Sequence, residues 1–375
     1  MNEYIVLYLT PSVRLLGARR SLLSLVKNLS PPFKPFVVCS NSGPLTEELI
    51  KLNIPAKVVK HYNWRKGKYF FHRYLQVYQL SKLIDEIKPS IIHSNEIYSL
   101  PSAIKARGKQ KIPIVVHNRL KITPRQIKNY YLSKADRIIA VSKASADDFA
   151  HCNFKDRVCM VYNGLDLKEF SPDKSLRDKT RQKLGFAVDD FVCGIIGLIG
   201  ERKRQHIAIQ SAKIVIHKNR KCHFLFVGDP PASMKDYSNA IKKDCELSGL
   251  SKNVHFLPFQ SNIKPLYSAL DLNLLISSEE GFGRTIIEAG AMEIPSIGTR
   301  IGGIPELIIN NLTGYLIVLD DINKLSDIIL DCANNPEKLK EMGLNARKII
   351  EENFSIQKHC NAIQLIYLEL LGIEK

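Results

Sequence analysis

EGFGRTIIE, residues 280–288, is the stretch that decides the fold of this 375-residue chain. It follows DLNLLISSE (271–279), a short apolar run typical of a buried strand, and precedes AGAMEIPSIGTRIGGIPELI (289–308). The order predicts a strand, a glycine-containing turn and the start of a helix. In a parallel sheet, such an order places the amino end of a helix at the carboxyl edge of the strands.

The chemistry of this turn favours a ligand that carries both phosphates and hydroxyls. The amino end of a helix attracts anions, and Gly281 and Gly283 allow the backbone to approach a ligand closely. Glu280 and Glu288 would repel a phosphate, but they can accept hydrogen bonds from hydroxyls. A nucleotide-sugar has both groups. The structural alternative is that Thr285 and Glu288 form a capping box and that Glu280 is an exposed loop acid.

Short apolar runs alternate with helical patterns in both halves, which predicts an α/β fold of two doubly wound, Rossmann-like domains. Strands are expected at 4–9, 36–40, 56–59, 90–94, 112–118, 137–142 and 158–164, and then at 191–200, 224–229, 254–259, 271–277, 295–299 and 313–318. Helices are expected at 18–29, 45–52, 70–87, 205–217, 236–248, 321–333 and 336–352. Turn residues, a proline and a charge change at 163–175 predict domains of 1–168 and 169–355.

The composition is that of a soluble globular protein, with 45% apolar and 24% charged residues. No apolar run approaches the roughly 20 residues of a spanning helix, and MNEYIVLYLTPS (1–12) reads as a first strand, not a signal peptide. The eight cysteines are dispersed without a C-x-x-C pair, so we expect reduced, mostly buried thiols. These features predict a cytoplasmic protein.

The net charge of +17 is concentrated in the first half of the chain. Residues 1–170 hold 28 Lys and Arg against 12 Asp and Glu, whereas residues 171–375 hold 26 against 25. A basic half implies an anionic partner: nucleic acid, an acidic membrane surface or an anionic acceptor. Residues 62–78 combine basic side chains with many aromatics, which predicts either a helix that enters a lipid interface or one that packs its aromatics into the core. Nucleic acid is disfavoured because no RNA-binding aromatic pattern lies on a strand.

The motif at 280–288 resembles the donor-site signature of glycosyltransferase family 4, in the group 1 glycosyltransferases with the GT-B fold. That signature has two glutamates eight residues apart around a G-F-G turn, then a glycine pair followed by P-E, here at 302–306. The family's N-G-x-D…F-x-P segment matches at 163–172, and 89–95 and 135–149 match two further segments. The resemblance implies two domains facing across a cleft, with a last helix (356–375) that packs back onto the first domain.

For the second domain, the resemblance implies the donor site. GLIGERKRQ (197–205) aligns with a segment whose Arg and Lys bind the diphosphate. Lys203 keeps the Lys, but Leu198 stands where the Arg is expected, and Arg202 or Arg204 would replace it. Glu288 is expected to bind the ribose and Glu280 the transferred sugar. Backbone amides from Phe282, Gly283, Arg284 and Thr285 would face sugar and phosphate; Phe282 also fits a core anchor.

For the first domain, the resemblance places Gly17 in a loop that approaches the phosphate, but this chain has Leu16 and Arg19 where the family has Gly and Glu. Arg19 and Arg20 would meet an anionic acceptor or form a solvated helix face. His117, at the end of IPIVVHN (112–118), is expected to contact the donor sugar or support the transition state. His93 is expected to be structural.

These expectations combine into a retaining glycosyltransferase that uses a nucleotide-diphospho-sugar and a glycan or lipid-linked acceptor of envelope polysaccharide or lipopolysaccharide. No metal or other cofactor is expected, because no D-x-D motif occurs. We expect the protein to be peripheral at the inner face of the membrane. The alternatives are a sugar-nucleotide epimerase or phosphorylase of the same fold, or a degenerate binding protein. A dinucleotide-binding oxidoreductase is disfavoured because no G-x-G-x-x-G follows a strand.

Overall fold

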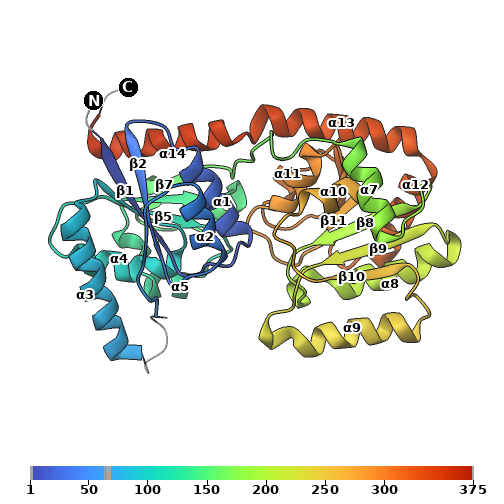
Figure 1. Ribbon diagram of the computed structural model, residues 1–375, viewed down its shortest axis with the longest axis horizontal. Coiled ribbons are helices and arrows are strands. Elements are labelled where there is room, and N and C mark those ends of the chain that lie inside the picture. Colours follow the sequence, from blue (N-terminus) through green and yellow to red (C-terminus); the bar gives the residue numbers. More distant parts are fainter. Residues whose placement is uncertain (1–2, 63, 65–68, 374–375) are drawn as a thin grey trace. The chain divides into compact units, whose positions relative to one another are not determined.

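A computed structural model describes residues 3–62, 64 and 69–373, which form two units (Figure 1). Unit 1 comprises Met1–Leu165 and Ser355–Lys375, and unit 2 comprises Asp166–Phe354. The chain passes between them inside the segment 163–175, so the observed boundaries lie three residues and one residue before the predicted 168 and 355. The predicted pair of parallel α/β sheets is confirmed.

Unit 1 is built on a seven-stranded parallel sheet with the order β3-β2-β1-β4-β5-β6-β7. Its strands are β1 Tyr4–Thr10, β2 Phe33–Cys39, β3 Ala56–Val58, β4 Ile91–Ser94, β5 Ile114–Asn118, β6 Arg137–Ala140 and β7 Val158–Met160. Its helices are α1 Gly17–Lys27, α2 Pro44–Lys51, α3 Phe70–Ile87, α4 Leu100–Arg107, α5 Pro124–Asn129, α6 Lys143–Asp147 and α14 Ile356–Leu371.

Unit 2 has a six-stranded parallel sheet with the order β10-β9-β8-β11-β12-β13. Its strands are β8 Phe191–Ile196, β9 Cys222–Val227, β10 Val254–Leu257, β11 Leu272–Leu275, β12 Ser296–Thr299 and β13 Gly314–Ile317. Its helices are α7 Lys174–Leu184, α8 Gln205–Lys218, α9 Lys235–Leu247, α10 Lys264–Ala269, α11 Arg284–Ala291, α12 Ile322–Asn334 and α13 Pro336–Asn353.

Helices cover both faces of the unit 1 sheet, and successive side chains of β1 point to opposite faces. Leu7 and Leu9 point into a core formed with α3 and α4, whereas Val6 and Tyr8 point into a second core formed with α1, α2 and α14 (Figure 1). A parallel sheet buried on both faces needs apolar side chains at successive positions. The short runs of Val, Ile and Leu in this chain satisfy that need.

The last helix, α14, belongs to unit 1 and packs against α1. It lies close to the backbone of Gly164, where an added Cβ would stand 2.6 Å from the Cβ of His359 and 2.8 Å from the Cα of Ile356. The expectation that the final segment returns to the first domain is confirmed. All eight cysteines are free thiols, and six of them are buried.

Candidate functional site

The residues of unit 2 that the sequence predicts to bind a donor lie where the order of its strands reverses. The chain runs outward from β8 through β9 to β10 and then returns to β11, on the other side of β8. In doubly wound sheets, ligands bind at the carboxyl ends of the strands beside this switch point. The loops that follow β8 and β11 contain the two segments that the sequence singles out, 197–204 and 276–283.

The turn after β11 has a backbone that its glycines make possible. Gly283 has φ of 114° and precedes the first residue of α11, so the turn enters the helix through a conformation that other residues rarely adopt. Gly302 has φ of 54°, and a Cβ at that position would lie only 1.8 Å from the carbonyl oxygen of Glu280. The glycine pair after β12 therefore lets a second loop pack directly on the turn that carries Glu280.

Glu280, expected at the sugar, and Lys203, expected at the diphosphate, lie together. The Lys203 ammonium is 2.6 Å from the Glu280 carboxylate, and each side chain is only 16% exposed. Lys203 closes a short 3₁₀ turn, Glu201–Lys203, just before α8. This ion pair joins the loop after β8 to the loop after β11, and it places a cation and a hydrogen-bond acceptor at one point of the sheet edge.

Glu288 lies on the first turns of α11 and is almost completely buried. Its Oε1 accepts a 2.6 Å bond from Arg284 Nε, and its Oε2 accepts a 2.9 Å bond from the hydroxyl of Tyr267. The capping-box alternative is wrong, because α11 begins at Arg284 and its N-cap is Gly283. A carboxylate offers about four lone pairs, so Glu288 keeps acceptor capacity for a ligand hydroxyl.

Two further predicted residues, Phe282 and Thr285, belong to the same turn and helix as Glu288. The hydroxyl of Thr285 is buried and has no hydrogen-bond partner among the described residues. Phe282 is buried and packs edge-on against Phe354 at 6.0 Å between ring centroids, so it does anchor the core. An unsatisfied buried hydroxyl is costly unless a ligand supplies its partner, which makes Thr285 a strong candidate for donor binding.

Arg202 and Arg204, the candidates to replace the missing arginine at Leu198, differ in their surroundings. Arg204 forms a 3.0 Å ion pair with Asp320, away from Glu280. Arg202 lies 3.9 Å from Glu279, a neighbour of Glu280, and is 41% exposed. The long, exposed contact leaves Arg202 the freer of the two to turn toward an anion.

In unit 1 the switch point lies between β1 and β4. Gly17 begins α1 there, and a Cβ built on it would meet no atom within 4 Å, so open space adjoins it. Arg19 donates a 2.9 Å bond to Glu96, which follows β4, and both side chains are mostly buried. The expectation of a solvated face at Arg19 is therefore wrong. Arg20 bonds the carbonyl of Leu15 at 3.1 Å.

His117 and His93 lie side by side on β5 and β4, both fully buried. His93 Nε2 is 2.8 Å from His117 Nδ1, and the rings stack at 4.9 Å between centroids. Burial, with the nearby charge of Arg119, holds the pKa of both imidazoles well below the ordinary value of 6.5. Both rings are therefore neutral at physiological pH. The Nε2 atom of His117 has no partner within the described part of the chain.

Several residues at this edge were missed by the sequence reasoning. Glu96 Oε2 and Asn118 Nδ2 are buried without partners among the described residues. Arg119 binds the side-chain oxygens of Asn95 and Asn163 at 2.8 and 2.7 Å. The signal was available: Asn118 ends the predicted strand 112–118, and Arg119 follows it. Asn95 and Glu96 follow the predicted strand 90–94, and Asn163 opens the predicted linker 163–175.

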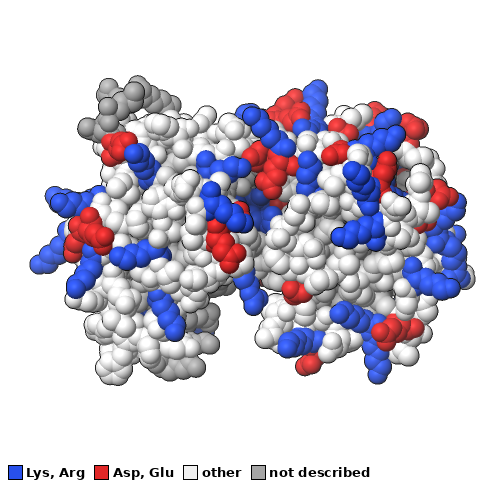
Figure 2. Space-filling model, viewed as in Figure 1, with Lys and Arg blue, Asp and Glu red and all other residues white. Residues whose placement is uncertain are grey.

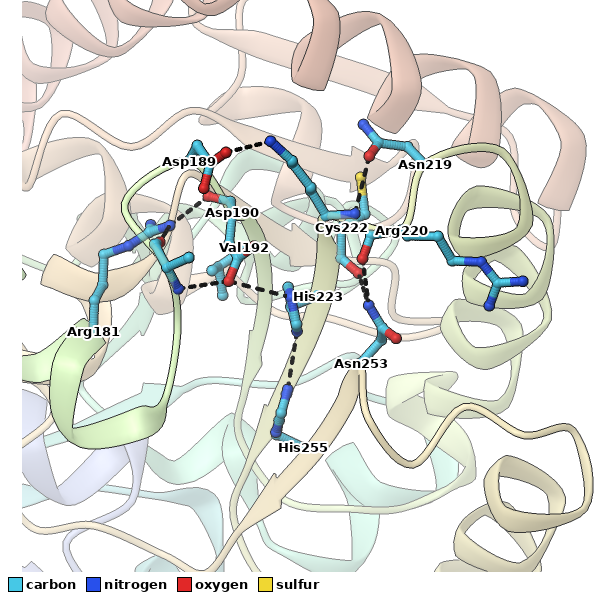
Figure 3. Close-up of polar contacts among 12 residues, drawn as sticks. Arg181, Asp189, Asp190, Val192, Asn219, Arg220, Cys222, His223, Asn253 and His255 are labelled. Atoms are coloured by element: carbon cyan, nitrogen blue, oxygen red, sulfur yellow. Dashed lines mark hydrogen bonds and ion pairs between the residues drawn. The ribbon is translucent and has the colours of Figure 1, made fainter.

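A separate polar cluster occupies the opposite edge of the unit 2 sheet (Figure 3). His223 Nδ1 lies 3.2 Å from His255 Nε2, and His223 Nε2 lies 3.4 Å from Asp190. Both histidines stand near the amino ends of their strands, so the cluster lies away from the Lys203–Glu280 pair. Across residues 3–62, 64 and 69–373, no three His, Cys, Asp or Glu side chains are grouped as a metal site would require.

Two family models match the chain, one in each half. The model described as Glycosyltransferase Family 4 matches residues 16–169, and the model described as Glycosyl transferases group 1 matches residues 177–349. Within the described residues, no helix is both long and apolar enough to cross a membrane.

Curated relatives include a synthase and a galactosyltransferase. N-acetyl-alpha-D-glucosaminyl L-malate synthase of Bacillus anthracis is 32% identical over 224 residues, 57% of this chain and 54% of its own length. The chain thus aligns with only about half of that relative. UDP-Gal:alpha-D-GlcNAc-diphosphoundecaprenol alpha-1,3-galactosyltransferase of Escherichia coli is 24% identical over 357 residues, 89% of each protein.

Solved structures share the whole fold. Anabaena Alr3699/HepE in complex with UDP and glucose superimposes with a TM-score of 0.87 and 24% identity, over 98% of this chain and 100% of that one. The two matched models, the full-length fold and the motif around Glu280 and Glu288 agree. The chain belongs to the group 1, family 4-like glycosyltransferases and has their GT-B fold of two Rossmann-like domains.

Proposed function

We propose that this protein transfers a sugar from a nucleotide-diphospho-sugar to a hydroxyl of a glycan or lipid-linked acceptor, with retention of anomeric configuration. The observation that carries the proposal is the Lys203–Glu280 pair at the β8/β11 switch point, with Glu288 and Thr285 on the adjoining helix. A cation, a helix amino end and buried carboxylates within one sheet edge match a ligand with phosphates and hydroxyls.

The residues have distinct tasks in this proposal. As the bond to the sugar breaks, negative charge grows on the leaving diphosphate, and Lys203, with Arg202, would stabilise that charge. Glu280 would exchange its bond to Lys203 for hydroxyls of the sugar, and Glu288 would accept from the ribose. In unit 1, Gly17 would let the backbone approach the phosphate, and His117 would contact the sugar. We propose that no metal is required, because these cations take the charge-neutralising role.

The test is a thermal-shift panel of UDP-, GDP- and ADP-sugars, each with and without EDTA. UDP-sugars come first, because the name of the Escherichia coli relative specifies UDP-Gal. One selective stabilisation that EDTA leaves unchanged is expected. Glu288→Ala should abolish the shift, whereas Glu337→Ala, an exposed acid on α13, should not. A panel without any shift would refute the proposed donor site.

Transfer itself is tested separately. With the selected donor and a lipid-linked acceptor, we expect product whose anomeric proton coupling by NMR matches that of the donor. Stabilisation without turnover on any acceptor would favour the alternative of a degenerate binding protein, which Leu198 and Arg19 suggest. Interconversion of the free donor would favour an epimerase.

We also propose that unit 1 binds the anionic inner face of the cell membrane through the beginning of α3. Five large side chains there are more than half exposed, on one side of the helix: Phe70, Phe71, Tyr74, Leu75 and Tyr78. In Figure 2 the first turns of α3 form an uncharged surface. The alternative that these aromatics pack into the core is wrong, since Phe71 is 83% exposed.

Cations border this aromatic face. Lys82 lies over the ring of Tyr78 at 4.7 Å, and Arg73 and Lys105 lie over Trp64 at 5.2 and 5.5 Å. Trp64 donates to Ser102 of α4, and its carbonyl accepts a bond from Arg73 of α3, so it links the two helices. Asn63 and the basic residues at 65–68, part of the segment that the sequence singled out, lie outside the described residues. Aromatics bordered by cations are the pattern of an interfacial helix at an anionic surface.

Sedimentation with vesicles tests this surface. Binding to vesicles with 30% anionic lipid is expected at low salt and should decline at high salt. Phe71→Ala with Tyr74→Ala should weaken it strongly, whereas Ile50→Ala, which removes an exposed apolar residue from α2 of the same unit, should not. Binding that ignores salt, or that survives the double substitution, would contradict the proposal.

A further inference from the structure

Unit 1 contains an unbroken chain of hydrogen bonds that ends at His117. The hydroxyl of Tyr8 is 3.0 Å from that of Tyr367, which contacts His93 Nδ1; His93 Nε2 is in turn 2.8 Å from His117 Nδ1. All four side chains are buried. Tyr8 and His93 come from adjacent strands of the sheet, whereas Tyr367 comes from the returning helix α14.

The two ends of this series of hydrogen bonds lie in different environments. At one end the Tyr8 hydroxyl lies in an apolar core, and Tyr367 is its only hydrogen-bond partner among the described residues. At the other end, Nε2 of His117 stands on the penultimate residue of β5, at the carboxyl edge where Glu96 and Asn118 also have unpartnered atoms. Neutral rings allow more than one arrangement of the protons along these hydrogen bonds, and only the first of them leaves every donor inside the core with an acceptor.

The first arrangement runs from Tyr8 outward. Tyr8 donates to Tyr367, Tyr367 donates to His93 Nδ1, and His93 donates from Nε2 to His117 Nδ1. His117 then carries its own proton on Nε2. Every donor inside the core has an acceptor, and the one free N–H is at the sheet edge.

The second arrangement runs inward and leaves the hydroxyl proton of Tyr8 without an acceptor inside the core. A buried donor without a partner costs about 1–3 kcal/mol, and orphaned donors are rarer than under-used acceptors. Neutral rings are required in both arrangements. The low pKa of His93 and His117, which burial and then the charge of Arg119 cause, meets that requirement; His359 is the other titratable group that acts on both rings.

We propose that Tyr367 and His93 are positioning residues that fix His117 as a neutral hydrogen-bond donor, with its proton on Nε2 directed to an oxygen of the substrate. The inference rests on the proposed transferase function of this edge. In this tautomer His117 cannot take the proton of the acceptor hydroxyl, so it does not serve as the base. It donates to a sugar hydroxyl or a phosphate oxygen, the partner that the buried Nε2 lacks among the described residues.

Histidine tautomers can be read directly by long-range ¹H–¹⁵N NMR of protein labelled at histidine. The signals of His117 and His93 are assigned by comparison with His117→Gln and His93→Gln. We expect both rings of the wild-type protein to be neutral with the proton on Nε2 between about pH 5.5 and 8. A proton on Nδ1 of His117, or a ring that titrates near 6.5, would overturn the proposal.

Removal of the Tyr367 hydroxyl tests the positioning role. Tyr367→Phe should remove the bond that holds His93 in one tautomer, so that both His93 and His117 become mixtures of the two neutral tautomers. Tyr130→Phe, at another buried tyrosine of unit 1, should leave the tautomers of both rings unchanged. Tyr8→Phe should act more weakly than Tyr367→Phe, because Tyr367 can still donate to His93. An unchanged His117 signal in Tyr367→Phe would refute the role of Tyr367.

The activity of these variants separates this inference from the proposed function. With the donor found in the thermal-shift panel, Tyr367→Phe should lower kcat about 10-fold or more and change KM for the donor little. Its pH profile should stay flat between pH 6 and 8, because no base has been removed. If no donor is ever turned over, the proposed function fails, while the NMR result still decides the tautomer.

Discussion

The ammonium of Lys203 and the carboxylate of Glu280 lie 2.6 Å apart, 77 positions apart in sequence, on loops that follow two adjacent strands. Among the described residues, neither side chain has another group of opposite charge within 4 Å. A ligand that carries a diphosphate and a sugar offers a new partner to both at once. We propose that the pair exchanges this internal ion pair for two ligand contacts.

Replacement of Lys203 by Ala is expected to slow transfer. Loss of one donor to a developing negative charge typically costs about 10²–10³ in rate, so kcat should fall by that order while KM for the donor changes less. Steady-state kinetics with the selected donor provide the measurement. Lys338→Ala, which breaks an exposed ion pair with Asp331, is the control. Wild-type kcat in Lys203→Ala would remove Lys203 from the site.

Thr285→Val should weaken donor binding without loss of stability. The Thr285 hydroxyl is buried and unpartnered among the described residues, so its replacement by an isosteric methyl removes an unsatisfied group. The melting temperature of the free protein should stay or rise, and the shift caused by the donor should shrink.

Thr299→Val is the matched control for this change. Its hydroxyl donates a 2.7 Å bond to the carbonyl of Ser277, so its loss should cost about 1 kcal/mol and lower the melting temperature. If Thr285→Val lowers it as much, Thr285 has a structural partner and no donor-binding role.

Glu96→Gln should weaken acceptor use. One oxygen of Glu96 holds Arg19 and the other is free of partners among the described residues, so we expect it to accept from an acceptor hydroxyl. A charged hydrogen bond contributes about 1.5–3 kcal/mol, equivalent to roughly 10–100-fold in KM for the acceptor. Glu86→Gln makes the same charge change at an exposed pair of unit 1 and should have no effect. An equal effect of both variants would point to net charge alone.

Gly302→Ala should destabilise the protein by more than the strain of its positive φ alone, because the added Cβ would collide with the backbone of Glu280. Gly302 and Gly249 both have positive φ, 54° and 66°, but only at Gly302 would a Cβ collide with another backbone. Gly249→Ala should cost about 1–2 kcal/mol from backbone strain. Gly302→Ala should cost more in urea unfolding and also reduce the thermal shift with the donor. An equal loss of unfolding free energy in the two variants would mean that the contact between residue 302 and Glu280 does not matter for stability.

Stability should decline in mild acid because of the buried histidines. The folded pKa of His93 and His117 is well below 6.5, so the unfolded chain binds their protons first as pH falls. Their stabilising contribution is complete above about pH 6.5 and is lost below it, by about 1.4 kcal/mol per pH unit for each ring. Urea unfolding at pH 7.5, 6.0 and 5.0 provides the test, and His117→Gln should flatten the slope. A pH-independent stability in this range would contradict the burial of these rings.

Much of the fold could be predicted because the chain is locally consistent. The helix at 70–87 was predicted at its observed ends, and the strand at 254–259 was two residues too long, since apolar patterning locates elements better than it locates their ends. Helices α4, α5, α6, α7 and α10 were missed. Leu100–Arg107 contains a proline and a serine near its start, and Lys174–Leu184 is so polar that only its buried face marks it as a helix.

The proximity of Glu280, Thr285 and Glu288 could be predicted from the sequence because one continuous motif carries them. The contacts within unit 1 could not be predicted, because their residues come from distant segments: His93 on β4, His117 on β5 and Tyr367 on α14 meet only in the folded unit. The pairing of Arg19 with Glu96 was likewise invisible, since 77 positions separate them. The role of a single residue that belongs to no sequence motif can be inferred only from the residues that it contacts in the folded protein.

The return of α14 to unit 1 fixes an order of events during synthesis. Unit 2 is one continuous segment, so it can fold as soon as Phe354 has left the ribosome. Unit 1 is interrupted, and Tyr8 and His93, made early, must wait for Tyr367, more than 270 residues later, to close their hydrogen bonds. Unit 1 is therefore completed only after the whole of unit 2 has been made.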